Sequence, residues 1–283
     1  MDFRLGCAVW AYSGWVGDFY PRGIRQSEFL KVYSDRLTTV EINSTFYVIP
    51  DLATVKRWAS STDQNFRFCP KFPKQLSHSG SLMPHLDQSK QFLDLMANLD
   101  DRLGVTFVQL PPSYAPSNFA DLEKFLVALR QDNLQIAVEV RHNDWFKPPH
   151  SDRLNALLTD LAIGRVLLDS RPIYTPEAPP VTQQRRKPNL PLQPAITAPF
   201  TLIRFISHPE SDLNLRFWQE WENYLNQWLS AGIQVYFFMH CPIEERSPHH
   251  ALALQKILEK SGMPIAALPW QNIAAAPQQL SLF

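Results

Sequence analysis

The chain has 283 residues, of which 45% are hydrophobic, and its 27 basic and 27 acidic residues cancel. This length and apolar content suffice for one α/β barrel, while the neutral total charge gives no general argument for nucleic-acid binding. The three widely spaced cysteines are typical of reduced thiols, and no signal peptide or membrane-spanning run is present. We therefore expect a cytoplasmic protein without a membrane partner.

Eight short segments rich in β-branched and aromatic residues predict strands. In chain order they cover residues 4–12, 38–47, 66–72, 104–112, 135–142, 164–170, 200–206 and 233–240. Most are separated by segments with helical periodicity, such as 27–37, 121–131 and 215–230. Eight alternating βα units predict a TIM barrel of parallel strands. An open doubly wound sheet is the alternative, although no Gly-x-Gly-x-x-Gly follows the first strand.

One connection departs from this pattern. Residues 171–199, after the sixth strand, contain eight prolines and the basic run Arg185-Arg186-Lys187. Such proline density resists regular structure, so we expect a long loop that leaves the C-terminal face of the barrel. It is either a surface excursion or a cationic lid over the barrel mouth. The barrel itself is expected to form a single domain over residues 1–270, followed by a flexible tail at 271–283.

Polar residues alternate with apolar ones near the ends of the predicted strands. In residues 38–47, Val40 and Ile42 should face the helices, which turns Glu41 and Asn43 toward the barrel axis. The same parity turns further polar side chains inward on the later strands: Lys71, Gln109, Glu139, Arg141, Asp169, Arg204 and His240. A barrel interior is normally filled with Val, Ile and Leu, and unpaired buried charge is unfavourable. We therefore predict a ligand site there; a self-satisfied ion network is the alternative.

The residue types suggest acid–base chemistry on an anion. Glu41 and Glu139 are candidate proton donors or acceptors, and Lys71 is a candidate electrostatic or nucleophilic group. Arg141 and Arg204 are candidate clamps for phosphate or carboxylate. Further ligand-binding candidates are Trp10, Tyr12, Asn43, Gln109, His142, Asp169, Arg171 and His240.

A divalent metal held by glutamate, aspartate and histidine is an alternative for the same cluster. We favour metal-free chemistry, because no local motif such as His-x-x-Glu-His occurs and several cations surround the carboxylates. The sequence does not specify a cofactor.

Several motifs together resemble one bacterial family. They are GCAVWAYSGWVGDFYP, LTTVEINSTFY, FRFCPKFPKQLSH, LGVTFVQLPPS, AVEVRHNDWF, LLDSRPI, QRRKPNLP and LIRFISHPE. Over nearly the whole chain they are similar to the domain of unknown function 72 (DUF72) family, and more closely to its YecE-like branch. The resemblance implies a TIM barrel but no established reaction. Some barrels of this family have been likened to endonuclease IV, but the dense histidine ligands of that enzyme are absent here.

The chain closes with a short motif, Gln279-Leu280-Ser281-Leu282-Phe283. It resembles the pentapeptide by which bacterial proteins bind the DNA polymerase sliding clamp. In that reading Gln279, Leu280, Leu282 and Phe283 bind a groove of the partner. The alternative is that these apolar side chains pack on the barrel's own surface. The sequence thus supports two hypotheses. The first is an enzyme acting on an anionic substrate that carries phosphate or carboxylate, with nucleic-acid-derived compounds among the candidates. The second is a non-catalytic ligand-binding accessory recruited to the clamp.

Overall fold

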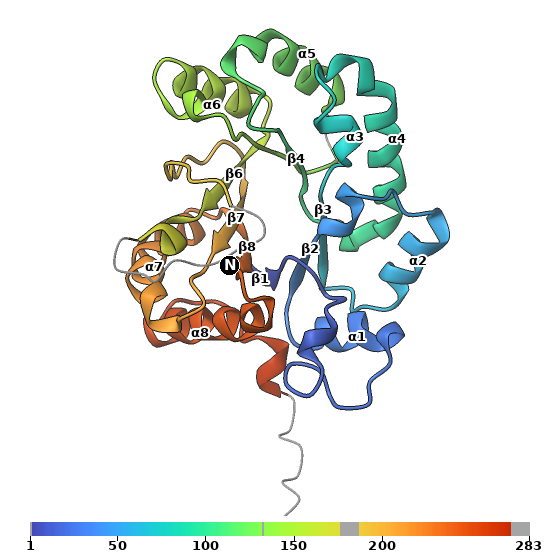
Figure 1. Cartoon of the computed structure of the whole chain (residues 1–283), viewed down its shortest axis with the longest axis vertical. Helices are drawn as coiled ribbons and strands as arrows, with labels where there is room; N and C mark the ends of the chain where they lie inside the picture. Colours follow the sequence, from blue (N-terminus) through green and yellow to red (C-terminus); the bar gives the residue numbers. More distant parts are fainter. Residues whose placement is uncertain (1, 132, 176–186, 273–283) are drawn as a thin grey trace, which may run out of the picture.

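The computed structural model describes residues 2–131, 133–175 and 187–272. Its strands form one ring around a central axis (Figure 1). They are β1 (Phe3–Cys7), β2 (Thr39–Ile42), β3 (Arg67–Pro70), β4 (Thr106–Gln109), β5 (Ile136–Glu139), β6 (Gly164–Asp169), β7 (Phe200–Ile206) and β8 (Gln234–His240). All neighbouring pairs are parallel, and β1 pairs with both β2 and β8.

The ring closes between β3 and β4 through few hydrogen bonds. Gly104 N donates to Phe68 O (2.8 Å) and Phe72 N donates to Phe107 O (2.9 Å). Single parallel bridges at Phe68 and at Lys71 mark the same junction. The TIM-barrel prediction is therefore confirmed, and the open-sheet alternative is wrong.

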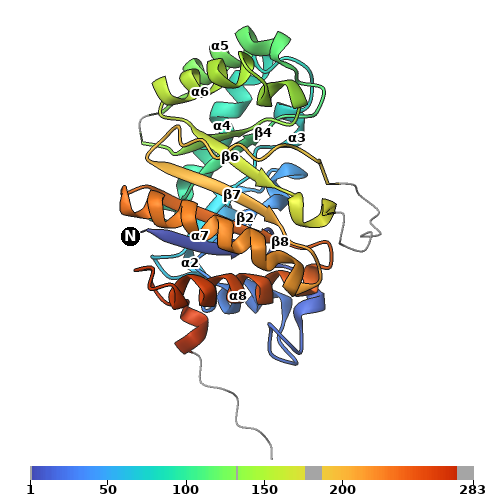
Figure 2. The same ribbon diagram turned by 90° about the vertical axis from the view of Figure 1, so that its left-hand side faces the viewer.

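Helices cover the outside of the ring (Figures 1 and 2). They are α1 (Phe29–Ser34), α2 (Leu52–Ser60), α3 (Lys74–Ser77), α4 (Leu86–Met96), α5 (Phe119–Leu129), α6 (His150–Asp160), α7 (Leu215–Ser230) and α8 (Ser247–Lys260). Their apolar sides and the outward-facing strand residues form one continuous core; Trp221 of α7 and Phe237 of β8, for example, meet edge to face at 5.9 Å. None of the helices in the described ranges is both long and apolar enough to cross a membrane.

The middle of the barrel is apolar. Phe107 of β4, Phe200 and Leu202 of β7 and Phe238 of β8 point inward from three strands and form a buried cluster. Gly164 of β6 makes room for it, because a Cβ atom there would lie 2.7 Å from the Phe200 ring. This layer separates two polar ends, so that any chemistry at one end is isolated from the other.

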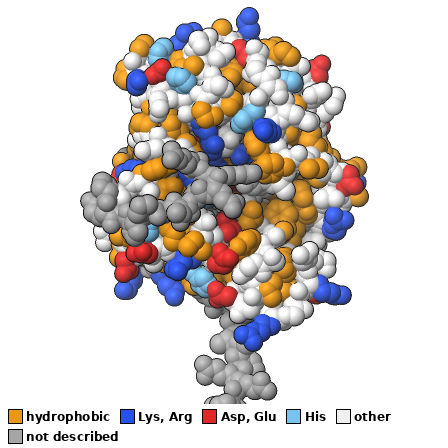
Figure 3. Space-filling view, in the orientation of Figure 1, with side chains coloured by type: hydrophobic (Ala, Val, Ile, Leu, Met, Phe, Trp, Pro, Cys, Tyr) orange, Lys and Arg blue, Asp and Glu red, His pale blue; other side chains and the backbone are white. Residues whose placement is uncertain are grey.

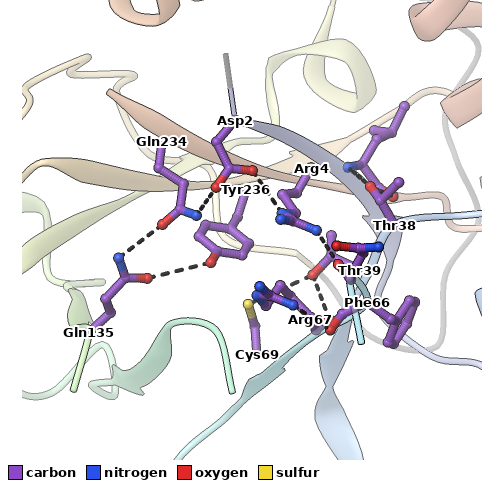
Figure 4. A network of polar contacts seen from close by, with 12 residues as sticks. Asp2, Arg4, Thr38, Thr39, Phe66, Arg67, Cys69, Gln135, Gln234 and Tyr236 are labelled. Atoms are coloured by element: carbon purple, nitrogen blue, oxygen red, sulfur yellow. Dashed lines mark hydrogen bonds and ion pairs between the residues drawn. The ribbon is translucent and has the colours of Figure 1, made fainter. Parts of the chain in front are cut away.

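The end that holds the N-termini of the strands is closed by a polar network (Figure 4). Arg4 Nε donates to Asp2 Oδ1 (2.8 Å), and the Gln234 amide donates to the other Asp2 oxygen. Gln135 Nε2 donates to Gln234 Oε1 (2.9 Å), and the Tyr236 hydroxyl donates to Gln135 Oε1 (3.4 Å). These polar side chains therefore satisfy one another.

The proline-rich segment returns to the opposite end, where the strands have their C-termini. Ser170 Oγ donates to Pro188 O (2.7 Å), and Leu190 packs against Leu168 of β6 and Ile206 of β7. Residues 176–186, which include Arg185 and Arg186, lie outside the described residues. Whether the segment acts as a cationic lid remains a prediction.

Candidate functional site

Three charged side chains meet at the C-terminal end of the barrel. Glu41 of β2, Glu139 of β5 and Arg204 of β7 point inward and are at most 5% exposed. Arg204 donates two hydrogen bonds to Glu41, Nε to Oε2 (2.8 Å) and Nη2 to Oε1 (3.0 Å), and a third to Glu139 Oε2 (2.7 Å). A single guanidinium group therefore links two carboxylates across the barrel.

A second arginine occupies the remaining oxygen of Glu139. Arg141 follows β5, and its Nε donates to Glu139 Oε1 (2.6 Å). Burial alone would raise the pKa of Glu139, but Arg141 and Arg204 lower it to about 2. Burial is likewise outweighed at Glu41, where Arg204 holds the pKa well below its usual range. Both carboxylates are thus ionised and paired at neutral pH, which does not favour the acid–base role expected for them.

Lys71, directly after β3, is buried in a different environment. Its ammonium group donates to Asn43 Oδ1 (3.3 Å) and lies 4.1 Å from the centre of the Phe46 ring. Within the described part of the chain it has no ion-pair partner. Burial and the nearby Arg204 charge lower its pKa from 10.5 to about 7. Lys71 is therefore a buried amine that can gain or lose a proton near neutral pH.

His240 and Gln109 also face this end. His240 Nε2 lies 3.2 Å from Glu41 Oε2, and burial lowers the pKa of this imidazole to about 4, so the ring is neutral at pH 7. Gln109 is 3% exposed, and its Oε1 has no hydrogen-bond partner among the described residues. Gln109 thus offers an acceptor whose hydrogen bonding is incomplete among the described residues, whereas His240 faces Glu41.

The aromatic candidates lie at the rim. Trp10 packs edge to face on Trp58 of α2, at 5.4 Å between ring centres, and borders a cavity of about 60 Å³ that Glu41 and Asn43 also line. The Tyr12 hydroxyl donates to Glu245 Oε1 (2.6 Å), after β8. These two residues border the cluster but do not join its ion pairs.

His142 has a local role. Its Nδ1 accepts a hydrogen bond from Asp144 N (3.2 Å) and caps the 3-10 turn Asn143–Phe146. The histidine therefore fixes the segment that follows Arg141.

Asp169 and Arg171 require a correction. Asp169 faces the helices, where it accepts hydrogen bonds from Trp221 Nε1 of α7 (2.8 Å) and from Arg171 Nε (2.9 Å). Arg171 also pairs with Glu220 of α7 (2.8 Å). The inward residues of β6 are Val166 and Leu168 instead. The predicted inward direction of Asp169 was wrong because both faces of β6 are buried, so the run GRVLLD shows no alternation.

Two further charged residues lie close to the cluster: Lys187, which belongs to the basic run expected to form a surface loop or a cationic lid, and Glu244, which sequence reasoning missed. Lys187, at the end of the proline-rich segment, has its pKa lowered by burial and by Arg204. Glu244, after β8, has its pKa raised to about 8 by burial, and its Oε1 has no hydrogen-bond partner among the described residues. Glu244 could have been found from its position just beyond the last predicted strand, because the active sites of TIM barrels lie at the C-terminal ends of the strands.

The cluster carries more positive than negative charge. Arg141 and Arg204 already balance Glu41 and Glu139, so the remaining cations, Lys71 among them, add to a positive potential. In Figure 3, which looks onto this end of the barrel, Lys and Arg atoms gather near the centre. Among the described residues, no group of three His, Cys, Asp or Glu side chains could hold a metal ion.

A larger cavity of about 510 Å³ lies beside Lys71, between the segment after β2 and helix α3. Its lining residues are Phe46, Tyr47, Val48, Ile49, Pro73, Lys74, Gln75, His78 and Ser79. The remaining sequence candidates, Gln279, Leu280, Leu282 and Phe283, lie outside the described residues.

Comparison with known proteins places the chain among proteins without an assigned activity. The family model described as "Protein of unknown function DUF72" matches residues 4–273. Two Escherichia coli proteins, from strains K12 and O157:H7, are both described as UPF0759 protein YecE. Each is 34% identical over 283 residues, covering 99% of this chain and 99% of the relative.

Solved structures show the same architecture. A DUF72 family protein from Enterococcus faecalis V583 is 20% identical, with a TM-score of 0.70 over 91% of this chain and 95% of that one. A DUF72 family protein from Thermotoga maritima MSB8 is also 20% identical, with a TM-score of 0.67 over 92% and 100% of the two chains. At these identities the similarity extends to the fold alone.

Proposed function

Because the chain belongs to the DUF72 family, whose description names no activity, we propose from its own residues that the barrel mouth binds a small phosphate- or carboxylate-bearing ligand. One observation carries the proposal: Lys71 is 5% exposed, lies among arginines and has no ion-pair partner in the described ranges. A buried cation that makes no direct ion pair is unfavourable. A bound anion would supply that pair.

The paired groups hold the anion site in place. Glu41 and Glu139 fix Arg204 and Arg141, whose planar guanidinium groups would otherwise be free to move. Arg141 is the more accessible of the two, with 19% of its side chain exposed. It therefore presents its remaining N–H groups to a ligand in the geometry that suits phosphate or carboxylate oxygens.

We assign the acid–base role to Lys71 instead of to the two glutamates. An acid–base group works best when its pKa is close to the working pH, and Lys71 has a pKa of about 7. Its Nζ atom would donate a proton to the bound anion, or accept one from it. Such chemistry makes the protein an enzyme. Binding without turnover, which makes it a ligand-binding accessory, is the other outcome.

Titration calorimetry with sulfate tests the anion site, because sulfate keeps its charge between pH 6 and 9. We expect wild-type protein to bind sulfate at pH 6, and Lys71→Met to weaken binding by about tenfold or more, since a hydrogen bond to a charged group contributes about 1.5–3 kcal/mol. Lys124→Met, at an exposed position of α5, is the matched control and should bind like wild type. Equal affinity in wild type and Lys71→Met would contradict the proposal.

The sulfate affinity of the wild-type protein should also depend on pH. Lys71 is charged below its pKa of about 7 and neutral above it, so sulfate affinity should fall as the pH rises from 6 to 8. In Lys71→Met the fall should be absent. Parallel titrations at pH 6 with methyl phosphate and with acetate then distinguish a tetrahedral from a planar anion.

A second proposal rests on the sequence of the tail: every position of Gln279–Phe283 matches the sliding-clamp pentapeptide. We expect a QQLSLF peptide and the whole protein to bind purified clamp with micromolar affinity. Replacing Leu282 and Phe283 with alanine should abolish that binding, because apolar anchors supply most of the energy of such peptides. Unchanged binding by the double variant, or none by wild type, would contradict recruitment.

A further inference from the structure

The cavity beside Lys71 shares a wall with the cation cluster. Phe46 lines the cavity, and the centre of its ring lies 4.1 Å from Lys71 Nζ. His78 lines the cavity too, and its ring meets Phe46 edge to face at 5.1 Å. Burial and the charges of Lys71 and Arg141 lower the pKa of His78 to about 4. The cavity and the cluster therefore adjoin each other at Phe46, and the charges of the cluster act on His78 in the cavity wall.

The two walls of this cavity differ in chemistry. The segment after β2 contributes the apolar side chains of Tyr47, Val48 and Ile49, which are 60%, 72% and 37% exposed. The facing wall, from α3 and the residues after it, contributes polar groups, among them those of Gln75 and Ser79. Consecutive large apolar side chains on a protein surface commonly mark a binding site. In Figure 3 a hydrophobic area adjoins the Lys and Arg atoms at the centre of this face.

We propose that this cavity holds the ring of the same ligand whose anionic group binds at Lys71, so that the substrate class is an aryl or heteroaryl phosphate or carboxylate. This inference rests on the anion site proposed above. A flat ring fits walls of unlike polarity, because its face packs on Tyr47 and Val48 while polar edge atoms reach Gln75 or Ser79. A volume of about 510 Å³ leaves ample room for one ring.

Matched probes separate the ring from the charge. Methyl phosphate and phenyl phosphate carry the same anionic group, and only the second has a ring. We expect phenyl phosphate to bind wild-type protein at least about tenfold more tightly, because burying a ring removes a large apolar area from water. The double variant Tyr47→Ala, Val48→Ser should lose this advantage while its affinity for methyl phosphate stays unchanged. Val127→Ser, which alters an exposed apolar residue of α5, should keep the advantage.

Each outcome of this experiment is decisive. Equal affinities of the two probes for wild type, or an advantage that survives in the double variant, would overturn the ring site while leaving the anion site intact. No binding of either probe would overturn both. If the double variant instead changes the oligomeric state in size-exclusion chromatography and the phenyl advantage persists, the apolar wall is an interface between protein copies and the ring site is excluded.

Discussion

The two ends of the barrel use similar polar residues in opposite ways. At the N-terminal end, Asp2, Gln135, Gln234 and Tyr236 hydrogen-bond to one another in a chain. At the C-terminal end the carboxylates are locked by arginines, and buried Lys71 makes no ion pair in the described ranges. The first arrangement stabilises the fold by itself, whereas the second is, in our proposal, completed by a bound anion.

Cavity size does not distinguish the two ends. A cavity of about 500 Å³ at the N-terminal end is lined in part by Gln135, Gln234 and Tyr236, and it is as large as the one beside Lys71. Its amide and phenol groups already have partners within the protein. The difference therefore lies in unmet hydrogen bonding and charge, which are the properties that a ligand can satisfy.

Removing Arg204 should give the largest effect. Arg204→Met leaves Glu41 and Glu139 buried without their shared cation, and we expect the free energy of unfolding to fall by about 3–5 kcal/mol. Urea denaturation monitored by circular dichroism measures this loss. Arg4→Met at the other end should cost less, about 1 kcal/mol or below, because its partner Asp2 has 42% of its side chain exposed. Similar losses in the two variants would show that the arginine ion pairs at the two ends contribute equally to stability.

Asp169→Asn tests the corrected orientation of β6. Asp169 anchors Arg171 and Trp221 on the helix side, so its replacement should lower the free energy of unfolding by about 2 kcal/mol. Sulfate affinity measured by calorimetry should not change, because the side chain does not reach the barrel mouth. Weaker sulfate binding with unchanged stability would return Asp169 to the ligand site.

Alternation along the strands explains which parts of the site could be predicted. In β2, Glu41 stands between Val40 and Ile42, so its inward direction follows from a period of two residues. The same rule placed Glu139 and Arg204 correctly. It failed at Asp169, because the residues before it are apolar on both faces.

The remaining features of the site depend on contacts between segments that lie far apart in the sequence. The sequence showed that carboxylates and cations converge, but not that one guanidinium group holds both Glu41 and Glu139, which lie 98 positions apart in the chain. Phe46 was missed because the predicted strand 38–47 extends beyond Ile42, where β2 ends and a 3-10 turn begins. Glu244 was missed because it follows β8, where no periodicity sets the direction of a side chain. Their roles depend on which segments the barrel brings together.

Lys71→Met should stabilise the protein, in contrast to changes at the N-terminal end. Burial makes the charged lysine unfavourable, so an apolar side chain of similar length should raise the free energy of unfolding at pH 7 by about 1–3 kcal/mol. Urea denaturation with Lys124→Met as the exposed control measures the gain. A loss of stability would show that Lys71 is satisfied within the fold and needs no ligand.

The pH dependence of the free energy of unfolding should also distinguish wild type from Lys71→Met. The unfolded chain keeps the Lys71 proton up to about pH 10.4, whereas the folded protein releases it near pH 7. The unfolded state therefore binds more protons between these values, and wild-type stability should gain a rising contribution as the pH increases from 7 toward 10. Lys71→Met should lack that contribution, and parallel pH profiles of the two proteins would contradict the assignment.

Tyr236→Phe should give the smallest effect of the series. The Tyr236 hydroxyl donates one long hydrogen bond to Gln135 Oε1 (3.4 Å), and the ring itself is 1% exposed within the barrel. The variant keeps the ring and removes only that bond, so we expect a loss of about 0.5–1 kcal/mol in the free energy of unfolding. Sulfate affinity should stay unchanged, because the apolar layer of Phe107 and Phe238 separates this hydroxyl from Lys71. A change in sulfate affinity would show that the two ends of the barrel are coupled through that layer.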